Sequence, residues 1–133
     1  MSKLGVVVVS HVPAIAEGVV TLMKEVAKDV SITFAGGTDD NEVGTSFAKI
    51  EAAFEENTGE TLLSLSILSF LLLAFYDLGS AKMNLEMVME LTDKEIHLYD
   101  TAFIESSYTA AALIQAGAEL DAIEEQLAPM KVK

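Results

Sequence analysis

The chain has 133 residues, with 8 lysines and arginines against 21 aspartates and glutamates and a formal net charge of −13. This excess of negative charge disfavours nucleic acid and anionic membranes as partners. The absence of cysteine excludes disulfides, thiol catalysis and thiolate metal sites, and fits a reducing cytoplasmic setting. With 51% hydrophobic residues at this length, we expect one folded domain over residues 1–133.

The first half of the chain predicts a strand, a helix and a second strand. Residues 4–9 are a valine-rich run without polar alternation, typical of a strand covered on both faces. Pro13 and the apolar spacing after it predict a helix to about residue 27. Residues 30–34 predict the second strand, and a loop rich in glycine and aspartate follows over residues 35–44.

The remaining elements continue this alternation. Thr45 or Ser46 can cap the next helix, and the third strand ends near Tyr76, although its start within the apolar stretch 59–72 is left open. Residues 81–91 predict a helix and residues 96–99 a short strand. Ser106 or Ser107 is expected to open a last helical region, which Gly117 interrupts.

This order predicts an α/β fold. We expect a three-layer sandwich, with a mainly parallel four-stranded sheet and helices on both faces. The apolar run at residues 62–76 resembles a membrane span, but three serines interrupt it and it is too short to cross a bilayer. A buried core segment is the preferred interpretation.

One histidine and one aspartate follow predicted strands. Ligands of open parallel sheets bind beyond the carboxyl ends of the strands. His11 follows the first strand and Asp77 the third. A carboxylate beside an imidazole can accept the Nδ1 proton, so that Nε2 can receive a transferred group.

Neighbouring loops offer groups suited to phosphate. Gly37 and Gly79 allow backbone N–H groups to approach an anion closely, and the hydroxyls of Thr38 and Ser80 can donate to its oxygens. Helices that begin after these strand ends point their positive ends at the same place. The pattern therefore predicts phosphoryl transfer through His11, which depends on positioning and electrostatics.

Other interpretations of these residues are simpler. A histidine at a strand end is by itself more often structural than functional, and His97, inside residues 96–99, is predicted to be a plain sheet residue. The acidic residues 39–42 lack the spacing of a calcium loop, so a solvated turn is favoured and no metal site is expected.

Three motifs carry a family resemblance over nearly the whole chain. They are VVVVSHVPAIAEG at residues 6–18, GGTDDNEVGTS at residues 36–46 and DLGSAKMN at residues 77–84. In this order they closely resemble the DhaM family, the phosphotransfer subunits of phosphoenolpyruvate-dependent dihydroxyacetone kinases. The domain of that family is similar to enzyme IIA of the mannose-type phosphotransferase system, which implies its fold.

The resemblance implies a phosphotransferase subunit with a phosphohistidine intermediate. His11 would accept phosphate from phospho-HPr, Asp77 would orient it, and residues 37, 38, 79 and 80 would surround the phosphate. The group would pass to ADP on the DhaL subunit, and the ATP formed there would phosphorylate dihydroxyacetone on DhaK. The resemblance also implies a cytoplasmic homodimer without a cofactor of its own, since the nucleotide and its magnesium belong to DhaL.

Two alternatives remain. A mannose-type enzyme IIA for sugar transport would pass phosphate to an enzyme IIB, but that group usually has a His-Gly turn where this chain has SHVP. A flavodoxin-like receiver or binding module fits poorly. A receiver needs an acidic pair after the first strand, and a dinucleotide binder needs a glycine-rich turn there.

Overall fold

A computed structural model describes residues 3–57 and 70–133. The strands are β1 (Lys3–Ser10), β2 (Ile32–Gly36), β3 (Phe70–Tyr76) and β4 (Glu95–Tyr99). They form one sheet in the order β2-β1-β3-β4, and every neighbouring pair is parallel. The predicted α/β class is confirmed, and the sheet, predicted as mainly parallel, is parallel throughout.

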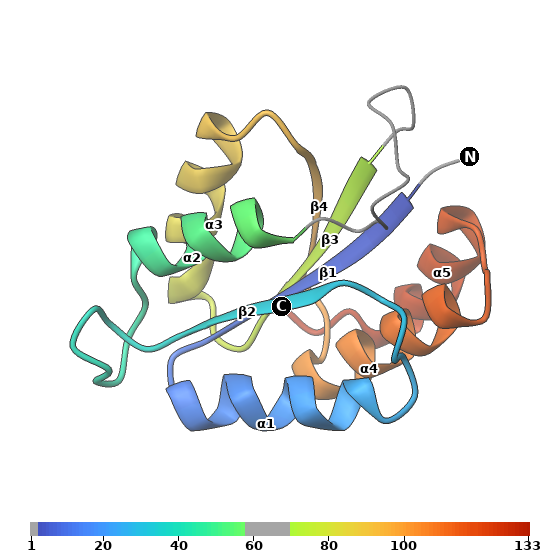
Figure 1. The fold of residues 1–133 in the computed structure, drawn as a ribbon, viewed down its shortest axis with the longest axis horizontal. Helices are drawn as coiled ribbons and strands as arrows, with labels where there is room; N and C mark the ends of the chain where they lie inside the picture. The colour runs from blue at the N-terminus through green and yellow to red at the C-terminus, as the bar shows by residue number, and fades with distance from the viewer. Residues whose placement is uncertain (1–2, 58–69) are drawn as a thin grey trace.

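Helices cover both faces of this sheet (Figure 1). On one face lie α1 (Pro13–Lys24), α4 (Phe103–Gln115) and α5 (Leu120–Leu127), followed by a 3₁₀ turn at Ala128–Met130. On the other lie α2 (Phe47–Glu56) and α3 (Ser80–Leu91). Each face has its own hydrophobic core, so the molecule has the three layers that the sequence predicts.

The valine-rich run supplies both cores. Val6 and Val8 pack into the core under α1, α4 and α5, whereas Val7 and Val9 pack into the core under α2 and α3. All four side chains are at most 1% exposed. Successive side chains of a strand point to opposite faces, so a strand with helices on both sides needs apolar residues at every position.

The apolar run at residues 62–76 is described only in part. Residues 71–76 lie in β3 with at most 6% exposure, while residues 62–69 lie outside the described residues. The stretch 59–72, in which the start of the third strand was left open, is therefore described only from residue 70 onward. No helix in the described ranges combines the length and the apolar character needed to span a membrane.

Two predicted boundaries are corrected between β1 and β2. The first helix ends at Lys24 rather than near residue 27, because Glu25 and Val26 bond to carbonyls three residues back and tighten the turn. The second strand is shifted from residues 30–34 to Ile32–Gly36, since Val6 pairs with Ile32 and Ser10 with Gly36.

The last helical region also begins earlier than predicted. Ser106 and Ser107 do not open it, because both hydroxyls donate to backbone carbonyls four residues back, inside a helix that begins at Phe103. The predicted interruption of this region at Gly117 is confirmed, since α4 ends at Gln115 and α5 begins at Leu120. Gly117 has φ +87° and its N–H donates to Ile114, while Ala118 donates to Leu113, a Schellman ending.

The strand order determines where a ligand can bind. The chain leaves β1 through α1 to β2 on one side, whereas β3 pairs with β1 on the other side. At this change of direction the connections after β1 and β3 diverge and leave a crevice beyond their carboxyl ends. The residues that follow β1 and β3 therefore meet at one place.

Candidate functional site

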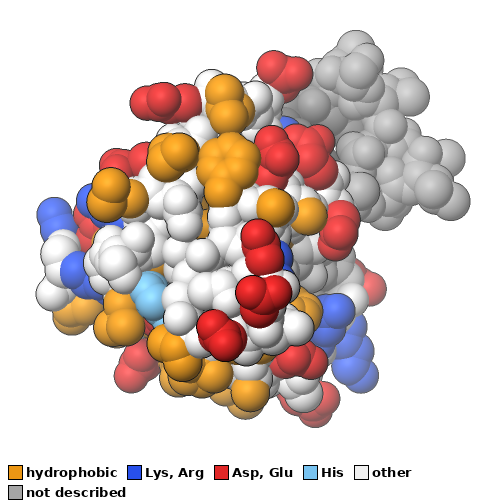
Figure 2. Space-filling model, turned by 90° about the vertical axis from the view of Figure 1, so that its left-hand side faces the viewer, with side chains coloured by type: hydrophobic (Ala, Val, Ile, Leu, Met, Phe, Trp, Pro, Cys, Tyr) orange, Lys and Arg blue, Asp and Glu red, His pale blue; other side chains and the backbone are white. Residues whose placement is uncertain are grey.

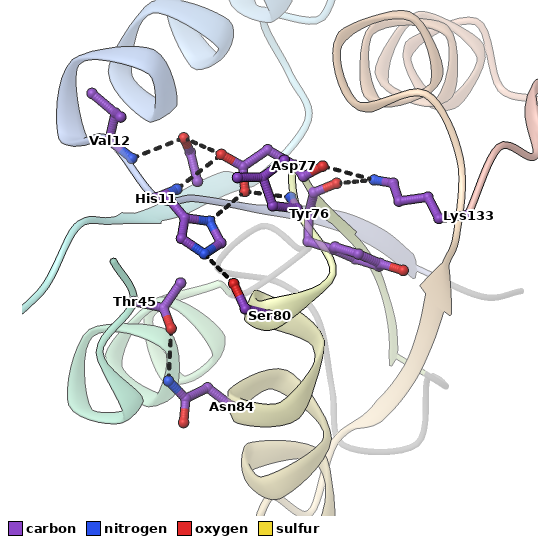
Figure 3. Close-up of polar contacts among 10 residues, drawn as sticks. His11, Val12, Thr45, Tyr76, Asp77, Ser80, Asn84 and Lys133 are labelled. Atoms are coloured by element: carbon purple, nitrogen blue, oxygen red, sulfur yellow. Dashed lines mark hydrogen bonds and ion pairs between the residues drawn. The ribbon is translucent and has the colours of Figure 1, made fainter. Parts of the chain in front are cut away.

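His11 and Asp77 lie side by side at this crevice (Figure 3). Val9 pairs with Tyr76 across the two strands, and the Asp77 N–H donates to the Val9 carbonyl at 3.2 Å. The His11 Nδ1 atom lies 2.8 Å from Asp77 Oδ1. The parallel register alone therefore brings together two residues that are 66 positions apart in the sequence.

The Asp77 carboxylate is the centre of a hydrogen-bond network. Its Oδ2 accepts from the backbone N–H of His11 at 2.9 Å and from the hydroxyl of Ser10 at 2.8 Å. Its Oδ1 accepts from the Leu78 N–H at 2.7 Å, besides its contact with the imidazole. The Ser10 hydroxyl in turn accepts from the Val12 N–H at 3.1 Å, so the network also orders the start of α1.

This network keeps Asp77 charged. Burial of the carboxyl acts to raise its pKa, but the hydrogen bonds from His11, Ser10 and Leu78 outweigh that effect and hold the pKa of Asp77 below its ordinary value. An ionised carboxylate only accepts hydrogen bonds, so the His11 Nδ1 atom is the donor. The Nε2 atom of the neutral ring therefore keeps its lone pair.

Ser80 contacts the second ring nitrogen. Its Oγ atom lies 2.6 Å from His11 Nε2, and because Nε2 carries a lone pair, the hydroxyl is the donor. Ser80 is the first residue of α3, whose N-terminus has no side-chain cap, so the positive end of the helix faces the ring. His11 is 9% exposed, and its Nε2 atom faces the start of α3, a helix end suited to an anion.

Gly37, in the β2–α2 loop, packs closely against the turn that carries His11. Gly37 has φ +76°, and a Cβ atom there would lie 2.7 Å from Pro13 and 2.8 Å from the Glu42 carbonyl. Its N–H donates to the Ser10 carbonyl at 3.1 Å. Gly37 thus joins the β2–α2 loop to the turn that carries His11.

Thr38 closes the β2–α2 loop on itself, and Gly44, near the end of the loop, bonds to His11. The Thr38 N–H donates to the Glu42 carbonyl, and the Thr38 hydroxyl accepts from the Glu42 N–H. The Gly44 N–H donates to the His11 carbonyl at 2.9 Å. The structure thus brings His11, Asp77 and Ser80 into direct contact, whereas Thr38 bonds within its own loop. The phosphate roles of residues 37, 38, 79 and 80 stay predictions.

Three further polar residues adjoin the site, and the sequence predicted no role in the site for any of them; Thr45 was expected only as a possible helix cap, a place that Ser46 takes. Ser10 belongs to the Asp77 network, and Asn84 Nδ2 donates to Thr45 Oγ1 at 2.7 Å beside the ring (Figure 3). Asn84 lies four residues after Ser80, and this spacing on a predicted helix was the signal available for it.

A charged cluster lies beside the site, at the ends of β3 and β4. Asp100 accepts from the Tyr76 hydroxyl at 2.5 Å and pairs with Lys82 at 3.1 Å. Burial acts to raise the pKa of Asp100, but the bonds from Tyr76 and Lys82 hold it below its ordinary value. The Lys133 ammonium donates to the Tyr76 and Asp77 carbonyls and covers the Tyr76 ring.

Sequence comparisons connect this geometry with known proteins. The family model EIIA-man, described as the PTS system fructose IIA component, matches residues 5–124. The phosphotransferase subunit DhaM of the PTS-dependent dihydroxyacetone kinase of Lactococcus lactis is 46% identical over 97% of both chains. The phosphoryl donor subunit DhaM of kinase 1 from Listeria innocua is 42% identical, over 97% of this chain and 96% of that one.

A solved structure shares the fold. The crystal structure of EF1359, a protein of unknown function, superposes with a TM-score of 0.76 over 98% of this chain and 97% of that one, at 24% sequence identity. This likeness supports the architecture alone. The family model and the relatives carry the assignment: the chain belongs to the EIIA-man family of phosphotransferase-system IIA components and groups with the DhaM phosphotransfer subunits.

Proposed function

We propose that this chain is the phosphoryl carrier of a phosphoenolpyruvate-dependent dihydroxyacetone kinase. In this proposal, His11 takes a phosphoryl group from phospho-HPr and passes it to ADP on a DhaL subunit. ATP formed there then serves a DhaK subunit that binds dihydroxyacetone. The two relatives are subunits of dihydroxyacetone kinases, which supports the substrate, and the His11 environment supports the chemistry.

The observation that carries the proposal is the pairing of both ring nitrogens of His11. Asp77 holds the proton at Nδ1 and the lone pair at Nε2 faces the start of α3. In the first transfer, the Nε2 lone pair forms a bond to phosphorus while the bond from phosphorus to the donor nitrogen breaks. In the second, an ADP oxygen displaces Nε2. The imidazolium-like charge that develops during attack is stabilised by the Asp77 carboxylate.

The phosphoryl group is proposed to lie among residues 37, 38, 79 and 80. Ser80 is the nearest donor, because its hydroxyl already contacts Nε2. Backbone N–H groups at the start of α3 would face the anion, which adds about 0.3–1 kcal/mol in a typical exposed setting. The chain itself needs no metal or nucleotide for this step, since magnesium and ADP are placed on the partner.

Exposed apolar side chains beside the site favour a protein partner. Val43 is 76% exposed, Leu78 58% and Met83 72%. Val43 precedes Gly44, which bonds to His11, and Leu78 follows Asp77. Figure 2 shows a histidine reaching the surface with hydrophobic side chains beside it. Large apolar groups that a carrier exposes next to its reacting atom suit docking of another protein better than release of a small molecule.

A labelling experiment tests the proposal. Incubation with labelled phosphoenolpyruvate, enzyme I and HPr is expected to label the wild-type protein with acid-labile, base-stable phosphate, and His11→Ala is expected to take no label. Isolated labelled protein should then form ATP with DhaL and ADP. Discharge to a sugar-transport enzyme IIB instead would assign the chain to the alternative function. Size-exclusion chromatography would test the proposed homodimer, and cell fractionation the proposed cytoplasmic location.

A further inference from the structure

The proposed chemistry leaves Thr45 and Asn84 without a role, although both lie close to His11 in Figure 3. Asn84 follows Ser80 by one turn of α3, so the two side chains share a face of the helix. Thr45 follows Gly44, which bonds to the His11 carbonyl. Figure 3 shows Thr45 and Asn84 on the side of the imidazole that Nε2 and Ser80 occupy. They therefore border the space that a group on Nε2 would enter.

The hydrogen bond between Thr45 and Asn84 has a defined direction. Asn84 Nδ2 donates to Thr45 Oγ1 at 2.7 Å, and an amide nitrogen only donates. The Thr45 oxygen is thus the acceptor, and its own proton is available for another partner. Within residues 3–57 and 70–133, no acceptor for that proton is seen. Thr45 is half-buried, so a polar acceptor for its proton would be favourable.

A phosphoryl group on His11 would need more than one donor. Its three terminal oxygens share close to two negative charges. Ser80 lies 2.6 Å from Nε2, so the incoming phosphorus needs the space that this hydroxyl takes, and Ser80 must turn aside to reach one oxygen.

Nearby lysines are engaged in other contacts. The Lys49 ammonium donates to the Gly36 carbonyl and the Asn41 side chain, and Lys82 pairs with Asp100. The chain has a formal net charge of −13, so a phosphoryl group on His11 adds negative charge to an already negative molecule. Because these two lysines have other partners, neutral hydrogen-bond donors close to the phosphoryl oxygens would have to stabilise that charge. The Thr45 hydroxyl is a neutral donor with a free proton beside this space.

We propose that Thr45 is a second phosphoryl-contacting residue and that Asn84 is its positioning residue. The Thr45 hydroxyl donates to an oxygen of the group on Nε2, and the Asn84 amide holds the Thr45 oxygen so that its proton points there. This inference rests on the proposed function, because it requires that His11 is phosphorylated.

Substitutions at Thr45 test the contact. Thr45→Val keeps the shape of the side chain and removes the hydroxyl, whereas Thr45→Ser keeps the hydroxyl. We expect Thr45→Val to lower kcat for transfer from phospho-HPr about tenfold or more, as for loss of a hydrogen bond to a charged group, with little change in KM. Thr45→Ser should restore most of the rate. Thr21→Val, the same change on the exposed face of α1, should transfer at the wild-type rate.

A double-mutant cycle tests the positioning role. Asn84→Ala leaves Thr45 in place but free to turn, so we expect a smaller loss of about threefold, and no further loss when it is added to Thr45→Val. Losses that multiply would show that Asn84 does not act through Thr45. Asn84→Ala also provides the test if Thr45→Val does not fold.

The outcomes separate this inference from the proposed function. Thr45→Val that folds and transfers at the wild-type rate overturns the contact and leaves the phosphohistidine intact. Wild-type protein that takes no label overturns both. A loss in Thr45→Val that appears only in KM would indicate a role in docking and would also overturn the contact.

Discussion

His11 and His97 are the two histidines of the chain, and different groups surround their rings. His11 has a carboxylate at Nδ1, 2.8 Å away, and a hydroxyl at Nε2, 2.6 Å away. His97 lies in β4 with 34% of its side chain exposed, and both of its nitrogens face carboxylates, Glu124 at 3.4 Å and Glu95 at 3.2 Å. A carboxylate only accepts hydrogen bonds, so neither nitrogen of His97 faces a donor such as a hydroxyl. Only His11 has the hydrogen bonds of a nucleophile.

The positions of the two histidines in the sheet explain this difference. His11 follows a central strand at the crevice between β1 and β3, where helix starts and loops converge. His97 lies within the outermost strand, where its neighbours come from the same strand and from α5. A strand-end position gives a side chain partners from several elements, and ligands of open parallel sheets bind at such positions.

The largest expected difference comes from removing each ring in turn. His11→Gln should lower phosphorylation by phospho-HPr at least about a thousandfold, because no other histidine among the described residues has a ring nitrogen that faces a hydroxyl donor. His97→Gln should be phosphorylated at the wild-type rate. Initial rates of labelling measure both, and a strong loss in His97→Gln would contradict the assignment of roles.

Removing the carboxylate beside each ring should give the next largest difference. Asp77→Asn can donate to Nδ1 and so move the proton to Nε2, which should slow phosphorylation about a hundredfold or more while the fold is retained. Glu124→Gln beside His97 should change the rate less than about twofold. Far-ultraviolet circular dichroism serves as the fold control. A full transfer rate in folded Asp77→Asn would show that Asp77 does not orient the imidazole.

Substitutions at two glycines near His11, Gly37 and Gly79, test how the backbone around the site contributes to stability. Gly37→Ala places a Cβ against Pro13 and the Glu42 carbonyl at φ +76°, and should lower the free energy of unfolding by about 2 kcal/mol. Gly79 has φ −57°, and an added Cβ there would have nothing within 4 Å. Gly79→Ala should therefore change the free energy of unfolding by less than about 0.5 kcal/mol. Urea denaturation compares the two. Equal destabilisation would mean that the φ value and crowding at Gly37 do not determine its role.

The pH dependence of stability should also show the hydrogen bonds that stabilise the charged form of Asp77. Its pKa is lower in the folded protein, so its stabilising contribution is complete above the unfolded value of 3.8 and is lost as the pH falls through the lower folded value. The difference in unfolding free energy between wild type and Asp77→Asn should therefore be constant near neutrality and shrink below about pH 3.8. A difference that widens toward acid would contradict the charged network.

Much of the fold could be predicted because its signals are local. The valine run at residues 4–9 indicated a doubly covered strand, Pro13 began a helix, and Gly117 ended one. One error arose where a residue type has two uses. Ser106 and Ser107 were expected at a helix start, but serine also bonds back to a carbonyl inside a helix, and the sequence does not distinguish the two.

The sequence by itself determined the chemistry present in this protein: a histidine and an aspartate after two strands, glycines and hydroxyls in the neighbouring loops, and no thiol. Tertiary structure alone decided which of these groups meet. The register of β1 against β3 sets Asp77 at Nδ1, the start of α3 places Ser80 at Nε2, and the packing of α2 beside α3 joins Thr45 to Asn84. Contacts between residues far apart in the chain depend on how separate strands pair and how separate helices pack, and the pattern of one element does not say which partner it meets.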